Sequence, residues 1–211
     1  MSRHLSKFAV LVGAVVALYG PMLGVGPNRV ATAAAEPTAM SADALILSAD
    51  DVRRVAAFDD MNPIPVSDVR APSVGPGPGF GVPGQCRVAS DQNLAFAPGW
   101  TQFRSVTYRG AGDRAVIQSV AVYPDEGAAV QALSQLADQL SACSDAHTAA
   151  FPFQVHRQDA ATVAWCFGDG CPILYHVKSS ALIEIKVVHF PPTAGRTASQ
   201  LMQTISDRVN A

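Results

Sequence analysis

The chain has 211 residues, 49% of them hydrophobic, with 15 basic and 17 acidic side chains. Its length suits one domain with a sizeable core, and its hydrophobic content excludes a disordered protein. A slightly acidic balance without a basic cluster argues against nucleic acid and anionic lipid surfaces as partners.

The first residues show the three-part pattern of an export signal. A basic start precedes an uncharged apolar run at 8–25, and small residues allow cleavage after Ala35 or, two residues earlier, after Ala33. We therefore expect 1–35 to be a signal peptide and the remainder to be secreted, or periplasmic and associated with the cell wall. The alternative is an uncleaved membrane anchor, because about 18 apolar residues is the lower limit for a spanning helix.

A short helix is predicted near the start of the exported part. Residues 36–46 are expected to be a flexible lead-in to one domain at 47–211. Ser48 can cap a helix that ends near Ala57, and Asp51 completes the pattern of a capping box.

The segment 62–84 is rich in proline and glycine, most densely at 74–80. Proline and glycine at this density exclude a helix or a central strand. We interpret the segment as a surface loop, and the alternative is a lid over a groove.

Two strands at 101–108 and 115–123 flank a glycine-containing turn and are predicted to form a hairpin. The helix predicted next, at 125–142, has apolar residues at helical spacing on one face. This apolar stripe comprises Ala129, Leu133, Leu136, Leu140 and Cys143.

The second half of the chain predicts four strands and a closing helix. The strands are 153–157, 162–167, 173–177 and 182–190, and the helix begins at 193 or 195 and ends at 209. In the last strand, apolar residues alternate with Glu184 and Lys186, a pattern typical of a sheet with one solvent-exposed face.

Short turns between successive strands require antiparallel pairing. The order of elements predicts an α+β fold, an antiparallel β-sheet of about six strands with helices packed mainly on one face.

All four cysteines lie in the exported part, which carries 12 basic and 17 acidic side chains and a net charge of −5. An even number of cysteines in an exported chain predicts two disulfides, and three pairings are possible. We favour Cys166–Cys171, which closes a short glycine-containing loop, together with Cys86–Cys143. Cys143 ends the buried stripe of its helix and points toward the sheet, where Cys86 precedes the hairpin.

No specific catalytic or metal-binding motif is present, since GxSxG and HExxH are both absent. The spacing of Cys166, Cys171 and His176 suggests a metal site, but export favours oxidised thiols and zinc needs a fourth ligand. The CxxC spacing of a redox site is absent as well. We therefore predict no catalytic residues, no metal and no cofactor.

Aromatic residues on or beside the strands are the candidates for lining a ligand groove. Trp165 and Phe167 share one face of their predicted strand, and packing in the core is the simpler alternative. The candidates are Trp100, Trp165, Phe167 and Tyr175.

Several short motifs follow one another in a characteristic order. They are PGQC at 83–86, APGW at 97–100, VIQSVAVYP at 116–124 and SAC at 141–143. With the two later cysteines and the closing helix, this order resembles the PknH-like extracellular domain family, the sensor domain of a mycobacterial receptor serine/threonine kinase. The resemblance extends from about 45 to 209 and corresponds to a stand-alone secreted form.

The resemblance implies a twisted, mostly antiparallel sheet and a large cleft thought to bind an unidentified ligand. It also implies the bridges Cys86–Cys143 and Cys166–Cys171. It supplies no catalytic residue, and because no kinase domain is attached, we infer no intracellular output.

The leading functional hypothesis is an exported, sensor-like domain of the cell envelope that binds a small molecule, lipid or glycan without catalysis. Membrane contact is expected only through an uncleaved signal. A protein–protein interaction module is the alternative and predicts a broad exposed apolar patch. A secreted hydrolase is the third hypothesis.

Overall fold

The computed structural model describes residues 40–74, 83–146, 152–168, 170–190 and 192–209. The chain divides into two units, 1–37 and 38–211, and the fold below is that of the second. The predicted signal peptide lies outside the described residues, as do residues 75–82 of the predicted loop or lid.

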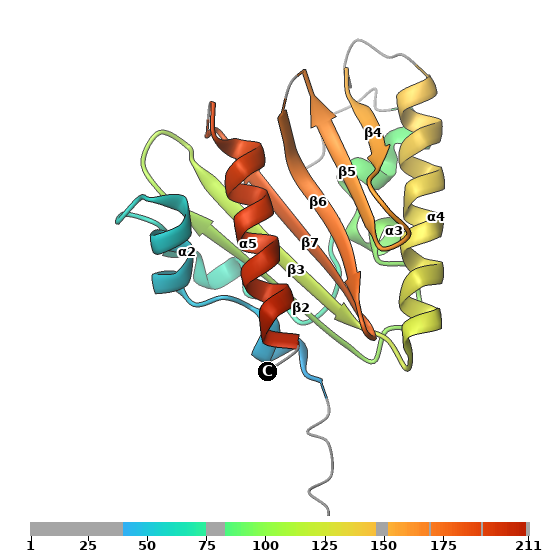
Figure 1. Ribbon diagram of the computed structural model, residues 1–211, viewed down its shortest axis with the longest axis horizontal. Helices are drawn as coiled ribbons and strands as arrows, with labels where there is room; N and C mark the ends of the chain where they lie inside the picture. The colour runs from blue at the N-terminus through green and yellow to red at the C-terminus, as the bar shows by residue number, and fades with distance from the viewer. Residues whose placement is uncertain (1–39, 75–82, 147–151, 169, 191, 210–211) are drawn as a thin grey trace, which may run out of the picture. The chain divides into compact units, whose positions relative to one another are not determined.

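A seven-stranded sheet with the order β1-β2-β3-β7-β6-β5-β4 organises the domain (Figure 1). Every neighbouring pair is antiparallel. After β3 the chain continues through helix α4 to the edge strand β4, and then returns strand by strand until β7 pairs with β3. The strands are β1 (Asn62–Pro63), β2 (Gln102–Arg109), β3 (Ala115–Val122), β4 (Gln154–Arg157), β5 (Thr162–Phe167), β6 (Gly170–Lys178) and β7 (Ala181–Val188).

Helices cover both faces of the sheet. The α5 face carries α1 (Ala42–Leu45), α2 (Ala49–Ala56) and α5 (Ala194–Val209), and the opposite α4 face carries η2 (Gly84–Ala89), α3 (Gln92–Ala95) and α4 (Glu126–Asp145). A further short helix, η1 (Pro65–Ser67), follows β1. Figure 1 shows α5 in front of the sheet and α3 behind it.

The predicted α+β class and antiparallel sheet are confirmed, but the helices are not gathered mainly on one face. The reason is the burial of the central strands. In β3 and β7, the side chains that point to either face of the sheet are buried. Helices therefore pack on both faces.

The long helices form where the sequence predicts them, because each has a cap and an apolar stripe. In α2, Ser48 and Asp51 form the predicted capping box. In α4, Asp125 accepts a hydrogen bond from the Ala128 amide at 2.8 Å, and the predicted stripe from Ala129 to Cys143 is buried.

Residues 42–46 do not form a flexible lead-in. Ala42 and Leu45 belong to α1 and are buried against the core, where they pack with residues of α5. Ser41 caps this turn by accepting hydrogen bonds from the two amides that follow Ala42.

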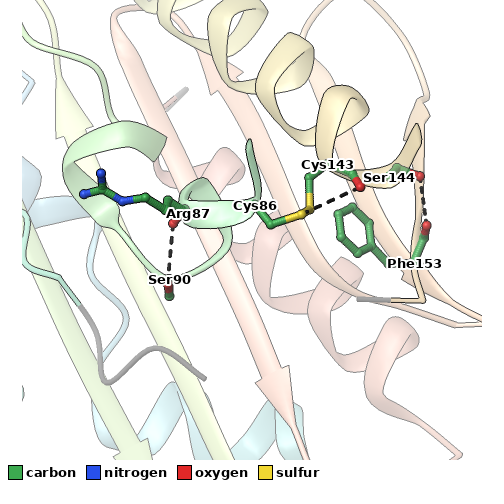
Figure 2. Close-up of a disulfide and its surroundings, with 6 residues drawn as sticks. All are labelled: Cys86, Arg87, Ser90, Cys143, Ser144 and Phe153. Carbon is green, nitrogen blue, oxygen red and sulfur yellow. Dashed lines mark hydrogen bonds between the residues drawn. A yellow bond between two sulfur atoms is a disulfide. The ribbon is translucent and has the colours of Figure 1, made fainter. Parts of the chain in front are cut away.

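Both predicted disulfides are confirmed. Cys86 in η2 is bonded to Cys143 near the end of α4, with Cα atoms 4.7 Å apart (Figure 2). The next residue along α4, Ser144, donates a hydrogen bond to the Phe153 carbonyl before β4. Cys166 and Cys171 join β5 to β6 on the α5 face. The first bridge therefore fixes η2, and with it α3, against α4.

Candidate functional site

A row of polar side chains crosses the sheet on its α4 face. Ser105, Ser119, Glu184 and Tyr175 are successive partners on β2, β3, β7 and β6. Residues directly opposite one another in antiparallel strands share a face, so these side chains form a continuous line, which we call the polar row. All four are at most 4% exposed.

Glu184 is the charged member of the polar row. Its Oε2 accepts a hydrogen bond from Ser119 Oγ at 2.9 Å, and its Oε1 lies 2.9 Å from Lys186 Nζ. The Glu184 side chain is fully buried and that of Lys186 is 15% exposed. The expectation that these two residues lie on a solvent-exposed face was therefore wrong, because α3, α4 and η2 cover this face.

Helix α3 connects the polar row to the segment that ends at residue 74. Asp91 caps this helix by accepting from the Asn93 amide at 3.0 Å. Gln92, the first residue of the helix, donates from Nε2 to Ser119 Oγ at 3.0 Å and accepts at Oε1 from the Ser73 amide at 3.3 Å. One side chain thus links the centre of the sheet to the segment before residue 75.

Two buried donors lie on the same face without a partner among the described residues, the Tyr175 hydroxyl and Trp165 Nε1. Burial, and next the charge of Glu184, raise the pKa of Tyr175 well above its usual value. Buried polar atoms without a partner are uncommon in native proteins, and Gln118 Nε2 is a further one on the α5 face.

A groove of about 530 Å³ opens on the α4 face beside the polar row. Its floor consists of Ser105, Thr107, Ile117 and Lys186, contributed by β2, β3 and β7. Thr107, Ile117 and Lys186 are successive partners across these strands. We call this hollow the sheet groove. Its volume lies within the range of small-ligand sites, about 300–1,000 Å³.

The walls of the sheet groove come from the segment 66–74 on one side and from η2 and α3 on the other. Val66 and Val74 expose 88% and 65% of their surface. Val69 pairs with Ser105 through two backbone hydrogen bonds of 3.0 Å, which attach the segment to the edge of the sheet.

An ion pair fastens the same wall. Arg104 Nη2 lies 2.9 Å from Asp68 Oδ2, and the hydrogen bond from Arg104 lowers the pKa of Asp68. Contacts with β2 thus hold the segment 66–74 against the sheet, and Val66, Val69 and Val74 line the groove beside its floor.

A second hollow of about 290 Å³ lies on the α5 face, between α5 and β6. It is lined by His176, Lys178 and Asp207, among others. Burial lowers the pKa of His176, whose Nδ1 lies 2.9 Å from Thr162 Oγ1.

The predicted groove aromatics lie in three places on the α4 face. Trp165 and Phe167 stack with ring centroids 5.7 Å apart, while Trp100 packs 5.9 Å from Phe103 elsewhere on this face. Tyr175 lies at the end of the polar row. None of the four is among the described residues that line the sheet groove, and their role in binding stays a prediction.

The sequence matches the PknH-like extracellular domain family over residues 37–208. The chain belongs to this family. Among solved structures, the PknH-like fold is similar to the extracellular domain of PknH from Mycobacterium tuberculosis, with a TM-score of 0.58 and 20% sequence identity. That match covers 80% of this chain and 94% of the other. A search of curated proteins finds no match.

Two further properties of this PknH-like domain concern its described residues. Among them, no three His, Cys, Asp or Glu side chains come together in a way that would hold a metal ion. Within the same ranges, no helix has both the length and the hydrophobicity needed to cross a bilayer.

Sequence reasoning missed Ser119, Glu184 and Gln92 as site residues. The sequence did contain a signal for them, because polar residues such as Ser119 and Glu184 interrupt strands that are otherwise apolar. Aligning those positions requires the register between β3 and β7, which are not joined by a turn and in which the partners Ser119 and Glu184 are 65 residues apart in sequence.

Proposed function

We propose that this chain is an exported, sensor-like domain of the cell envelope that binds a ligand in the sheet groove and performs no catalysis. The observation that carries the proposal is the groove itself, about 530 Å³ in volume and floored by three strands, with Lys186 of a buried ion pair in its floor. Membership of the PknH-like extracellular domain family and the two disulfides support export.

The stability of the fold does not explain the ion pair between Glu184 and Lys186. Replacing a buried ion pair with well-packed apolar residues is often neutral or stabilises a protein by about 1–4 kcal/mol. Glu184 and Lys186 lie on a strand whose other buried residues are apolar, so packing does not require them. The position of Lys186 in the floor of the groove supports a role in binding.

The walls of the groove favour a lipid over a glycan. Val66, Val69, Val74 and Ala89 contribute apolar surface, and the described lining presents no aromatic ring on which a sugar could stack. Covering exposed apolar surface contributes about 25 cal/mol per Å².

The test is a thermal-shift screen of the protein produced from the full chain, with panels of envelope lipids and of glycans. A ligand at a hundred times its Kd is expected to stabilise the folded state by about 2.7 kcal/mol. Thr107→Trp, which fills the floor of the groove, should abolish the shift. Gln131→Trp, on the exposed side of α4, is the control and should leave it unchanged. No stabilisation by any class would contradict the proposal.

The second candidate is a protein–protein interaction module, which the exposure of Val66 and Val74 favours. It predicts that partner binding survives Thr107→Trp and is lost in Val66→Ser/Val74→Ser. No observation on the described residues favours the hydrolase.

A further inference from the structure

The sheet groove has one charged side chain among its described lining residues, Lys186. No Asp or Glu is among them, and the partner carboxylate of Glu184 is fully buried in the polar row beside the floor. The groove therefore presents a single ammonium group to whatever enters it.

The ammonium group of Lys186 is ion-paired but has hydrogen-bond donors left over. Lys186 Nζ can donate three hydrogen bonds. Glu184 Oε1, at 2.9 Å, is its only ion-pair partner among the described residues, and Oε2 of the same carboxylate is engaged by Ser119. An ammonium on a mostly buried stem with donors to spare gains most from an anionic acceptor, because charge-assisted hydrogen bonds are about twice as strong as neutral ones.

An uncharged donor lies across the floor from this cation. Thr107 lies two strands from Lys186 on the floor, with Ile117 between them, and its hydroxyl makes no hydrogen bond with other described residues. The floor thus offers a charged donor on β7 and an uncharged donor on β2.

The apolar side of the groove lies on the segment 66–74. Val66 and Val74, at 88% and 65% exposure, are the two most exposed large apolar residues of the described chain, and both line this groove. A polar head at the floor leaves an attached apolar chain in contact with these valines.

From this arrangement we infer that the ligand is an anionic amphiphile, with a carboxylate or phosphate head at Lys186 Nζ and an alkyl chain against Val66, Val69 and Val74. The inference rests on the proposed function and specifies its ligand class. The net charge of −5 on the exported part disfavours an anionic bilayer surface, so the ligand is taken up as a single molecule.

The experiment measures the affinity of protein produced from the full chain for four probes. Palmitate and palmitoyl-lysophosphatidic acid carry the two anionic heads, monopalmitin is the neutral match, and acetate is a head without a chain. We expect each anionic probe to bind at least about ten-fold more tightly than monopalmitin, and we expect acetate not to bind measurably. The ratio between palmitate and the lysophospholipid shows which head the site prefers.

Variants assign the head and the chain to their parts of the groove. Glu184→Gln/Lys186→Met removes both charges together, so that no buried carboxylate is left unpaired, and should weaken palmitate about ten-fold while leaving monopalmitin unchanged. Lys186→Arg should retain anion preference. Lys178→Met, on the opposite face of the sheet, is the control and should have no effect. Val66→Ser/Val74→Ser should weaken binding of all three acyl probes, and Val130→Ser on α4 should weaken none of them.

The outcomes separate the ligand class from the site. Equal binding of palmitate and monopalmitin, unaffected by the double variant but abolished by Thr107→Trp, overturns the anionic head and leaves the groove as the binding site. Binding of glycans alone, again sensitive to Thr107→Trp, overturns the amphiphile. Binding with the same affinity in the Thr107→Trp variant overturns the proposed function. Binding only to vesicles of anionic phospholipid, and not to single amphiphiles, also overturns the inference.

Discussion

The two faces of the sheet differ in what they bury. On the α5 face, β7 presents Ile183, Ile185 and Val187 to α1, α2 and α5, and the packing is largely apolar, with buried Gln118 accepting from the Leu47 amide. On the α4 face, the same strand presents Glu184 and Lys186, which face Ser119 and the sheet groove. Two neighbouring residues, Glu184 and Ile185, are both fully buried in opposite chemical surroundings.

This difference follows from how far the helices extend. Helix α5 packs along β6 and β7, and α1 and α2 complete the cover beside it. Helix α4 packs against β4, β6, β7 and η2, while over β2 and β3 the α4 face has only short elements and the segment 66–74. One face is thus a core, and the other is part core and part groove.

The largest expected effect comes from breaking the ion pair of the α4 face. Glu184→Ala should lower the free energy of unfolding by about 3–5 kcal/mol, because it leaves the charge of Lys186 unpaired in a mostly buried position. Glu184→Gln/Lys186→Met should recover most of the loss. Urea unfolding at neutral pH measures both.

The matched change on the other face is Ile185→Ala, which should cost about 2–5 kcal/mol through the cavity it leaves. Unlike the loss at Glu184, this loss should not be recovered by altering Lys186. A cost below about 1 kcal/mol for Glu184→Ala would show that the pair is not buried as described.

The disulfides provide the next comparison, since one lies on each face. Removing Cys86–Cys143, with a sequence separation of 57, should cost about 4 kcal/mol, and removing Cys166–Cys171, with a separation of 5, about 2 kcal/mol. Paired Cys→Ala variants and thermal unfolding measure the two values. Because the first bridge also fixes η2 beside α3, its loss should reduce ligand affinity, whereas loss of the second should not.

A smaller effect concerns the acid stability of the α5 face. The hydrogen bond from Ser48 is the main cause that lowers the pKa of Asp51 from 3.8 to about 2, and Arg208 of α5 contacts the same carboxylate. A pKa lower in the folded than in the unfolded state stabilises the fold above about pH 4 and ceases to do so as the pH falls toward 2.

Asp51→Asn should therefore cost about 1 kcal/mol at pH 7, a value typical of a lost cap, and should flatten the dependence of stability on pH between 4 and 2. Asp50→Asn is the control, because the Asp50 side chain is 90% exposed. Unfolding followed at several pH values distinguishes the two variants. An unchanged pH profile in Asp51→Asn would contradict this assignment.

The smallest expected effect is at the edge of the α4 face. The ion pair between Arg157 of β4 and Asp138 of α4 joins side chains that are 49% and 75% exposed. Asp138→Asn should change the free energy of unfolding by less than about 0.5 kcal/mol, and the change should vanish in high salt. A cost above 1 kcal/mol would show that β4 depends on this contact.

Local signals in the sequence predicted much of the fold. The capping box at Ser48, the stripe of α4 that ends at Cys143 and the turn-linked strands of the second half formed as expected. The cysteine pairing was accessible because the stripe directs Cys143 toward the sheet. These features depend on neighbouring residues or on one helical period.

The groove depends on long-range register, which local patterns do not contain. Alternation in β7 placed Ile183 and Glu184 on opposite sides, but it did not show that both sides are covered. Whether Glu184 meets water or Ser119 is decided by β3 pairing with β7 across the whole crossover. Short covers such as α3, with four residues, also give no periodic signal.

The most direct test is hydrogen exchange of the full chain with and without palmitate, because it compares the two faces in one measurement. We expect added protection in β2 around Thr107, in β3 around Ile117 and in the segment 66–74, with α5 unchanged. Protection confined to α5 and β6 around His176, or no protection while palmitate is bound, would contradict the claim that the sheet groove is the binding site.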